Sequence, residues 1–333
     1  MWINSMSSMP KITVIIPTYN RGNLIHEAIF SVLKQEWIRE LFEVDLIIVD
    51  DASTDNTSAI VQEIINQEVG NISYSVLSQN SWWPAKPRNI WISLIHTSDY
   101  IFFLDSDDLL KESCFKTCLS FLNIQETCYG VYFYCENEYS QTIGYKKNIF
   151  QERDYRNVSY EEYLSGFLGF ELGLFLRWTY FIEHPHFRFD ETIISEGVLR
   201  SQLHKYCHEQ KMNFSLLDYI GRVYRQHHVS QKRIVQTVST ERFLKNAEWN
   251  RKLLEIQQND LYKYGKKPLL AKYNSHIWIN YLLAWPKRHT EWVKYLYKAY
   301  QLHKSIYYLL LFLISKYCNS LLRWLYKLFI YYK

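Results

Sequence analysis

The feature that most constrains this sequence is an apolar run at residues 100–104 that ends abruptly in acidic residues. The run reads Tyr-Ile-Phe-Phe-Leu, which is typical of a strand covered on both faces of a sheet. The residues that follow are Asp105, Ser106, Asp107 and Asp108. Open α/β folds bind ligands at the carboxyl ends of their strands, so these carboxylates predict a binding site for Mg²⁺ or Mn²⁺. Alternatively, an aspartate here caps a helix that starts near Leu109.

Strands and helices alternate along the first half of the chain. Apolar, β-branched runs predict strands at residues 11–16, 44–49 and 72–77, before the acidic strand. Helical spacing of apolar residues follows each strand, at residues 24–33, 60–65 and 88–95. This alternation predicts an α/β fold with a mainly parallel sheet and right-handed crossovers. No Gly-x-Gly-x-x-Gly or Gly-Lys-Ser/Thr loop follows a strand, which argues against dinucleotide-binding and P-loop proteins.

Four short motifs occur in a fixed order in this region. They are Ile-Ile-Pro-Thr-Tyr-Asn-Arg at 15–21, Val-Asp-Asp-Ala-Ser-Thr-Asp-Asn-Thr at 49–57, Pro-Arg-Asn at 87–89 and Leu-Asp-Ser-Asp-Asp at 104–108. In order and spacing they resemble the motifs of the inverting GT-A glycosyltransferases of family 2. The resemblance implies a GT-A fold, with a Rossmann-like sheet flanked by helices, a nucleotide-sugar donor that is usually a UDP-sugar, and a bound Mn²⁺ or Mg²⁺.

The resemblance also assigns candidate site residues. The donor-binding residues it implies are Pro17, Thr18, Tyr19, Arg21, Asp50, Asp51, Arg88, Asp105 and Ser106. The metal-binding residues are Asp105, Asp107, Asp108 and His227. The chemistry agrees, because a tyrosine ring can stack on a base and a carboxylate at Asp51 can accept a hydrogen bond from the uracil N–H. The alternatives are a packed turn aromatic at Tyr19 and helix caps at Asp50 and Asp51.

Two segments depart from the family pattern or allow a second interpretation. Trp82 and Trp83 stand where family members usually have small residues before the Arg-Asn pair, so the donor sugar is left open. Residues 223–230 resemble the Tyr-Arg-x-His-x-x-Ser segment that closes many family-2 catalytic domains and contain His227. A neutral histidine there could approach the metal; alternatively, the segment is a surface loop with solvated histidines.

The second half contains a candidate general base. Residues 187–197 resemble the acceptor-side segment of the family, in which an acidic pair at the head of a helix supplies the base. Glu196 matches the first acid of that pair, but Gly197 replaces the second. Glu196 is therefore the first candidate, followed by Asp190 and Glu191. Alternatively, these acids only stabilise the amino-terminal end of a helix over residues 198–210.

Composition limits the partners and the compartment. The net charge of the 333-residue chain is only +4, which does not indicate a nucleic-acid partner. The six cysteines are scattered without Cys-x-x-Cys spacing, as expected in a reducing, cytoplasmic setting. Residues 1–10 lack the charged and apolar regions of a signal peptide. We expect a catalytic domain over residues 1–235, with a nucleotide-sugar half at 10–125 and an acceptor half at 126–235.

The remaining residues, 236–333, predict an α-helical, aromatic and basic extension. No acidic residue follows Glu291, while seven lysines and arginines do. The apolar run at 306–314 is interrupted at Lys316, so it falls short of the roughly 20 residues that span a bilayer. Such a segment suits a helix lying on the inner face of the cell membrane. The alternative is a helical hairpin packed on the catalytic domain or in a homodimer.

These observations and the family resemblance together predict a metal-dependent glycosyltransferase, and the resemblance implies that the transfer inverts the anomeric configuration. The metal and Arg88 would hold the diphosphate of the donor, and Glu196 or a neighbour would deprotonate the hydroxyl of a saccharide or lipid-linked saccharide acceptor. The alternative is a non-catalytic scaffold that binds a sugar nucleotide, which Gly197 in place of the second acid would permit.

Overall fold

The computed structural model describes residues 9–36, 38–68, 71–81, 84–93, 95, 97–144, 149–150, 153–169, 171–184, 188–191, 196–225, 240–284 and 293–304. Contacts divide the chain into two compact units. The first comprises Met1–Phe189 and His204–Val229, and the second comprises Asp190–Leu203 and Ser230–Lys333. The predicted boundary between residues 235 and 236 falls outside the described residues, so it stays a prediction.

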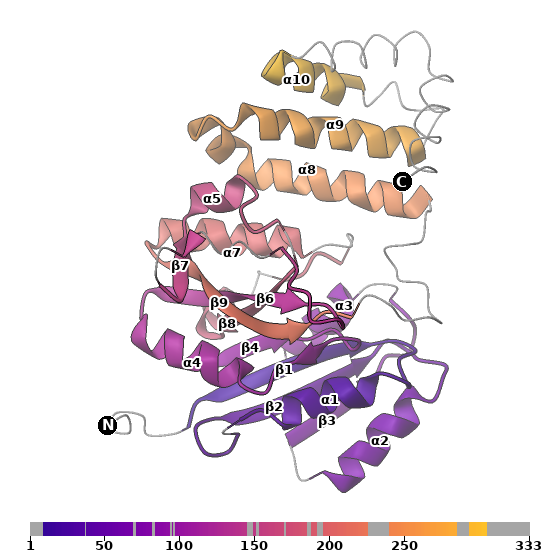
Figure 1. The fold of residues 1–333 in the computed structure, drawn as a ribbon. Coiled ribbons are helices and arrows are strands. Elements are labelled where there is room, and N and C mark those ends of the chain that lie inside the picture. The colour runs from indigo at the N-terminus through magenta and orange to yellow at the C-terminus, as the bar shows by residue number, and fades with distance from the viewer. Residues whose placement is uncertain are drawn as a thin grey trace. The chain divides into compact units, whose positions relative to one another are not determined.

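A mixed sheet forms the centre of the first unit (Figure 1). The described residues form nine strands in it: β1 (Lys11–Thr18), β2 (Glu43–Asp50), β3 (Asn71–Val76), β4 (Tyr100–Phe103), β5 (Leu109–Leu110), β6 (Cys128–Glu136), β7 (Tyr155–Val158), β8 (Leu172–Arg177) and β9 (Asn213–Val223). The order is β3-β2-β1-β4-β8-β6-β9-β5, with β7 also paired to β9. The first four strands are parallel, as the alternation of strands and helices predicts, and β8 is antiparallel to both of its neighbours.

Helices pack on this sheet, and α1, α2 and α4 do so through buried apolar residues. Those of the first unit include α1 (Ile25–Leu33), α2 (Thr57–Gln67), α3 (Ala85–Ile92), α4 (Cys114–Ile124), α5 (Tyr160–Leu164) and α6 (Thr179–Glu183). The buried residues of α1, α2 and α4 join alternate residues of β1, β2 and β4 in one hydrophobic cluster. Helix α3 contacts β1 and β2 and has no member in that cluster. The predicted α/β architecture is therefore confirmed.

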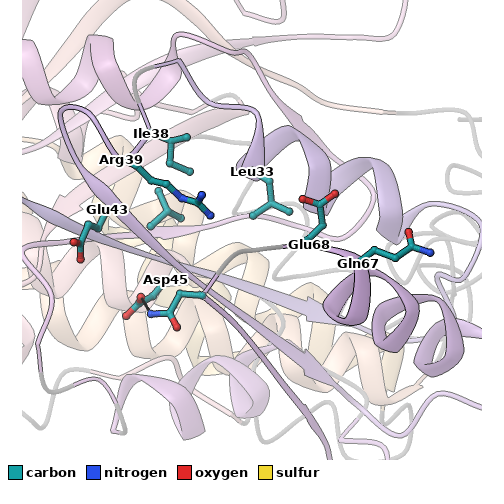
Figure 2. Close-up of a pocket in the computed structure, with 9 residues that line it drawn as sticks. Leu33, Ile38, Arg39, Glu43, Asp45, Gln67 and Glu68 are labelled. Atoms are coloured by element: carbon teal, nitrogen blue, oxygen red, sulfur yellow. Dashed lines mark hydrogen bonds between the residues drawn. The ribbon is translucent and has the colours of Figure 1, made fainter.

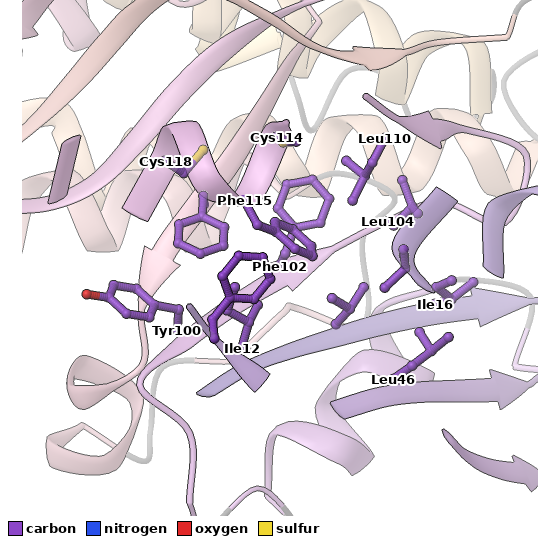
Figure 3. Packing of buried hydrophobic residues seen from close by; sticks show 14 of the residues in the cluster. Ile12, Ile16, Leu46, Tyr100, Phe102, Leu104, Leu110, Cys114, Phe115 and Cys118 are labelled. Atoms are coloured by element: carbon purple, nitrogen blue, oxygen red, sulfur yellow. The ribbon is translucent and has the colours of Figure 1, made fainter. Parts of the chain in front are cut away.

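Aromatic side chains fill the middle of that cluster (Figure 3). Phe102 of the acidic strand packs edge-on against Phe115 of α4, with ring centroids 6.0 Å apart. Tyr100 stacks on Phe175 of β8 at 5.3 Å. Full burial of each such side chain stabilises the fold by about 1.5–3 kcal/mol. Two side chains on one face of the strand that leads to the acidic residues are thus packed against aromatic rings of α4 and β8.

The alternative interpretation of the acidic residues, an aspartate that caps a helix starting near Leu109, is wrong. Leu109 and Leu110 instead form strand β5 and pair with Val223 and Arg222 of β9. Leu110 is only 5% exposed, so pairing with a distant strand overrides the local preference. The helix, α4, begins at Cys114, and Asp108 does not cap it.

The second unit is helical. It contains α8 (Thr240–Lys263), α9 (Lys267–Ala284) and α10 (Val293–His303), together with the first half of α7 (Gly197–Glu209). Val198 and Leu253 are buried in a small cluster with Trp249, Ile256 and Tyr273. None of the helices within the described part of the chain has the length and apolarity needed to cross a bilayer. Of the predicted membrane-associated region, residues 236–333, the last part from 305 to 333 lies outside the described residues.

Candidate functional site

Strands β1, β2 and β4 end side by side at one edge of the sheet. β1 lies between the other two, and its parallel register with β2 aligns Thr18 with Asp50. The Asp51 N–H donates to the Thr18 carbonyl at 2.8 Å and continues the ladder by one step. The loops that carry Tyr19, Asp51 and Asp105 therefore start from neighbouring strands at their carboxyl ends.

The loop after β1 is fixed to the loop after β2 through Asn20. Asn20 has a φ of 50°, in the left-handed region that asparagine tolerates. Its N–H donates to Ser53 Oγ at 2.8 Å, and its Oδ1 accepts from the Thr54 N–H at 2.7 Å. The neighbouring Tyr19 side chain stays outside the packed loop and is 40% exposed. Its ring is thus accessible for stacking, as the donor-site prediction requires.

The adjacent acids Asp50 and Asp51 have different environments. Asp50 is fully buried, and its two oxygens accept hydrogen bonds from the Ser53 N–H and the Tyr74 hydroxyl, both at 2.7 Å. Asp51 accepts from the N–H and the hydroxyl of Ser81, at 2.8 and 2.9 Å. Asp50 therefore stabilises the turn, whereas Ser81 orients Asp51 at the edge.

Burial affects the ionisation of Asp51. The residue is 6% exposed, and desolvation raises the pKa of its carboxyl above the usual value. The hydrogen bonds from Ser81 oppose this rise, and the negative charge of Asp50 adds to it. A carboxylate has about four acceptor positions, so Asp51 can still accept a hydrogen bond from a ligand N–H.

Arg88, on α3, pairs with the first acid of the acidic turn, which we define as residues 105–108. Its guanidinium donates to Asp105 at 2.7 Å. The charge also lies over the rings of Phe103 and Phe189, 5.6 and 5.2 Å from their centroids. Asn89 exchanges two hydrogen bonds, each 2.8 Å long, with the backbone of Phe189. These contacts of Arg88 and Asn89 thus fix the Arg88 guanidinium beside Asp105.

The other acids of the turn have arginine partners as well. Asp107 lies 3.6 Å from Arg21, and both side chains are 20% exposed. Asp108 is 1% exposed and lies 3.4 Å from the Nε of Arg222, and it accepts from the Arg225 N–H at 3.2 Å. Burial raises the pKa of the Asp108 carboxyl, and the charge of Arg222 opposes that rise. Asp108 therefore faces the protein interior.

The remaining predicted residues are partly placed. Ser106 and Thr18 are 6% and 3% exposed, and the buried Thr18 hydroxyl has no hydrogen-bond partner among the described residues. Pro17 is also buried, next to Thr18 in β1. His227, Trp82 and Trp83 lie outside the described residues.

Some residues that shape this edge were not predicted from the sequence. Tyr74, Ser81 and Arg222 each bind an acid of the site, but they belong to no recognised motif. Arg222 lies on β9, the last described strand along the chain, and the pairing of β9 in the sheet brings it to Asp108. A local pattern carries no signal for such a contact.

Asp105 and Asp107 fit the chemistry of a divalent-cation site. Carboxylate oxygens suit Mg²⁺ and Mn²⁺. Asp105 is 44% exposed and Asp107 20%, so water and phosphate oxygens can complete the coordination. Asp108 instead lies against Arg222. Over the described ranges, no group of three or more His, Cys, Asp and Glu side chains is arranged to hold a metal.

The candidate bases lie in the second unit. Asp190 forms an ion pair with Lys252 of α8, and its side chain is 16% exposed. Glu196 precedes α7 and pairs with Arg200 at 2.9 Å, with 35% of its side chain exposed. Glu191 is exposed. The side chain of Glu196 is therefore more accessible than that of Asp190.

A cavity of about 870 Å³ lies at the opposite edge of the sheet (Figure 2). It is lined by the first residues of β2 and β3 and the last residues of α1 and α2, together with Ile38 and Arg39. Lys11 pairs with Asp45 at 2.6 Å beside it. Because it lies at the amino-terminal ends of these strands, the cavity is separate from the acidic turn.

Known proteins with similar sequences cover parts of this chain. It is 37% identical over 115 residues to the poly(ribitol-phosphate) beta-N-acetylglucosaminyltransferase TarS of Staphylococcus aureus, a match covering 34% of this chain and 19% of TarS. It is 39% identical over 104 residues to TarP of the same species, covering 31% of this chain and 30% of TarP. The matches to TarS and TarP thus span less than a third of each relative.

Solved structures extend the similarity of fold. The crystal structure of S. aureus TarS residues 1–349 in complex with UDP superposes with a TM-score of 0.63 at 23% identity. The superposition covers 88% of this chain and 81% of that structure. The family model described as "Glycosyl transferase family 2" matches residues 13–189, more than half of the chain. The protein therefore belongs to glycosyl transferase family 2.

Proposed function

We propose that this protein transfers a sugar from a UDP-linked donor to a hydroxyl group of a cell-surface polymer or its lipid-linked precursor. The observation that carries the proposal is the grouping at one sheet edge of an exposed Tyr19 ring, an oriented Asp51 carboxylate and the Arg88–Asp105 pair. These supply an aromatic surface, a hydrogen-bond acceptor and a fixed cation. Uracil, its N–H and a diphosphate are the matching ligand groups.

The chemistry of the Tyr19 and Asp51 side chains supports binding of a uridine nucleotide. Tyr19 offers a face for the base, and Asp51 offers an acceptor for the imide N–H of uracil. A base without that N–H would leave one acceptor position of the buried Asp51 carboxylate unfilled beside the two that Ser81 occupies, and buried polar sites discriminate between ligands in this way. The solved TarS structures in this fold include complexes with UDP and with UDP-GlcNAc.

The reaction we propose is a single displacement with inversion, as the family resemblance implies. The acceptor oxygen forms a bond to the anomeric carbon while the bond to the nucleotide diphosphate breaks. Arg88 stabilises negative charge on the departing diphosphate. A divalent cation at Asp105 and Asp107 would neutralise more of that charge when bound. Glu196, with Asp190 and Glu191 as alternatives, takes the proton of the acceptor hydroxyl.

The acceptor proposal rests on the relatives. TarS, TarP and a Bacillus spizizenii enzyme, which is 37% identical over 139 residues, are poly(ribitol-phosphate) glycosyltransferases by name. The Bacillus match covers 42% of this chain and 19% of that enzyme. A polyol-phosphate or saccharide polymer is therefore the acceptor class we propose. The basic helical unit would bring the enzyme to the inner membrane surface, where lipid-linked precursors lie.

A panel of nucleotide sugars tests the proposal. Purified protein is incubated with UDP-, GDP-, ADP- and CDP-sugars, with Mn²⁺ or Mg²⁺, and release of the nucleoside diphosphate is measured together with binding by calorimetry. We expect binding and slow hydrolysis only with UDP-sugars, and faster turnover once a polyol-phosphate polymer is added. No binding of any UDP compound would refute the proposal. Binding of UDP without any turnover would instead favour the non-catalytic scaffold.

A further inference from the structure

The two partly exposed carboxylates of the acidic turn each face an arginine from a different loop or helix. Arg88 donates to Asp105 at 2.7 Å, and Arg21 lies 3.6 Å from Asp107. Each negative charge on this side of the turn therefore has a cationic partner within the protein. An incoming divalent cation meets a turn whose charge is already balanced.

The two arginines are held very differently. The Arg88 side chain is 4% exposed and lies over two aromatic rings, which restrict its position. The Arg21 side chain is 20% exposed, and its 3.6 Å separation from Asp107 exceeds the usual 2.7–2.9 Å of a charged hydrogen bond. Arg88 is thus held closely against Asp105, whereas the contact between Arg21 and Asp107 is longer.

The backbone of Arg21 is nevertheless anchored. Its N–H donates to Thr57 Oγ1 at 2.9 Å, and the next N–H, of Gly22, donates to Asp55 at 3.1 Å. The guanidinium itself makes long contacts, at 3.3 and 3.5 Å, with the carbonyls of Asn20 and Tyr19. The backbone of this loop is therefore held in place independently of the contact between the Arg21 guanidinium and Asp107.

We propose that Arg21 is a positioning residue that exchanges between Asp107 and the diphosphate of the donor, and thereby makes cation binding depend on the nucleotide. This inference deepens the proposed function and rests on it. A cation coordinated directly by Asp107 would be repelled by the Arg21 guanidinium beside the same carboxylate. A diphosphate offers that guanidinium two phosphate oxygens, which match its planar donors. Departure of Arg21 then frees Asp107 for the cation.

Thermodynamic linkage gives this exchange a measurable sign. If the nucleotide raises the affinity for the cation, the cation must raise the affinity for the nucleotide by the same factor. Removing the Arg21 charge should strengthen cation binding in the absence of nucleotide and weaken nucleotide binding in the absence of cation. A residue that merely stabilised the loop would weaken both.

Binding measurements on the full chain test the proposal. Mn²⁺ binding is followed by the paramagnetic resonance signal of the free ion, and UDP binding by calorimetry, for the wild type, Arg21→Gln, Arg21→Lys and Arg39→Gln. Arg39, labelled in Figure 2, is exposed at the opposite edge of the sheet, so Arg39→Gln removes the same charge far from the turn. Thermal denaturation confirms that each variant is folded.

We expect Arg21→Gln to bind Mn²⁺ alone roughly fivefold or more tightly than the wild type, at the lower end of couplings between linked sites. Its coupling factor between Mn²⁺ and UDP should fall by a similar amount. Arg21→Lys keeps the charge and should resemble the wild type in Mn²⁺ binding, and Arg39→Gln should match the wild type in both assays.

The failures of the two proposals are distinguishable. If UDP binds but Arg21→Gln leaves the affinity for Mn²⁺ alone unchanged or lower, the exchange is refuted and the proposed function stands. If UDP binds the wild type equally well with and without Mn²⁺, the exchange is refuted as well. If the wild type binds no UDP under any condition, the proposed function itself fails.

Discussion

The Arg88 guanidinium donates a hydrogen bond to Asp105 at 2.7 Å, and the Arg88 side chain is only 4% exposed. The partner carboxylate is 44% exposed. A buried cation is thus held beside an accessible anion at the carboxyl edge of the sheet. This arrangement leaves the positive charge in place when the carboxylate turns to another ligand.

Arg88→Lys should therefore weaken donor binding. Lysine keeps the charge but loses the planar donors and the stacking over two rings, and a cation–π contact contributes about 0.5–2 kcal/mol. We expect the Kd for UDP to rise roughly tenfold, which corresponds to about 1.4 kcal/mol. Calorimetry on the folded variant measures the change.

Arg177→Lys is the matched control. Arg177 on β8 also lies over a ring, Tyr100, at 5.8 Å, and donates to the carbonyls of Cys128 and Leu122 at 2.9 and 2.7 Å. It belongs to no predicted site. Its variant should lose thermal stability and keep the affinity for UDP. Equal loss of UDP affinity in both variants would indicate that Arg88 acts only through stability.

A second prediction distinguishes the structural role of Asp50 from the ligand-binding role proposed for Asp51. Tyr74→Phe removes the hydroxyl that donates to Asp50 Oδ2 and leaves a buried carboxylate oxygen without that bond. Such a loss costs about 1–3 kcal/mol of unfolding free energy. Chemical denaturation should show it, while the Kd for UDP changes little. A strong loss of UDP binding in a stably folded Tyr74→Phe would place Asp50 in direct contact with the ligand.

The sequence was sufficient to predict that the candidate residues share one edge of the sheet, because the carboxyl ends of neighbouring parallel strands must meet there. The strand order placed Tyr19, Asp51 and Asp105 together without any further information. It was not sufficient to predict which acid faces outward. Asp108 is buried by contacts with Arg222 and the Arg225 N–H, both more than a hundred residues later in the chain, whereas Asp107 pairs with Arg21. The same distant strand, β9, converts Leu109 from an expected helical residue into a strand residue.

The raised pKa of Asp51 gives a pH-dependent prediction. The carboxylate form accepts the N–H of uracil, and protonation removes that acceptor. Because burial raises the pKa of Asp51 above its usual value, UDP affinity should begin to fall at a higher pH than for an ordinary aspartate as the solution is acidified. Calorimetry across a pH series on the wild type and Asp51→Asn, which should lack this component, measures the effect.

The same shift predicts the opposite sign for stability. A carboxyl whose pKa is higher in the folded than in the unfolded state contributes stability below its unfolded pKa, and that contribution is lost as the pH rises through the folded value. At neutral pH, Asp51→Asn should therefore be at least as stable as the wild type while binding UDP less tightly. Denaturant titration checks this, and a marked destabilisation would indicate that the charge itself holds the turn.

The membrane proposal can be tested on α10. Leu296 and Ala299 on this helix are fully buried, while Lys294, Lys298 and Tyr297 are exposed. Near an anionic surface each basic residue contributes about 1 kcal/mol. Lys294→Gln with Lys298→Gln should therefore lower sedimentation with phosphatidylglycerol liposomes by roughly tenfold or more, and salt should weaken binding of the wild type.

The control for that test is Lys263→Gln with Lys267→Gln. These lysines are exposed at the junction of α8 and α9, so the double variant removes the same charge from another part of the helical unit. It should retain most of the liposome binding. If the wild type does not sediment with liposomes, the basic helices serve another partner, and a concentration-dependent mass would identify a homodimer.

The final prediction concerns the base. Glu196→Gln keeps the size of the side chain and a hydrogen bond to Arg200, which lies 2.9 Å away in the wild type, but cannot take a proton. Turnover should fall by roughly 10²–10⁴-fold while the Kd for UDP stays near that of the wild type. Glu209→Gln, an exposed change at the far end of the same helix, is the matched control and should be fully active. If Glu196→Gln retains turnover and Asp190→Asn or Glu191→Gln abolishes it, the base lies in the turn before α7 and Glu196 only stabilises the start of its helix.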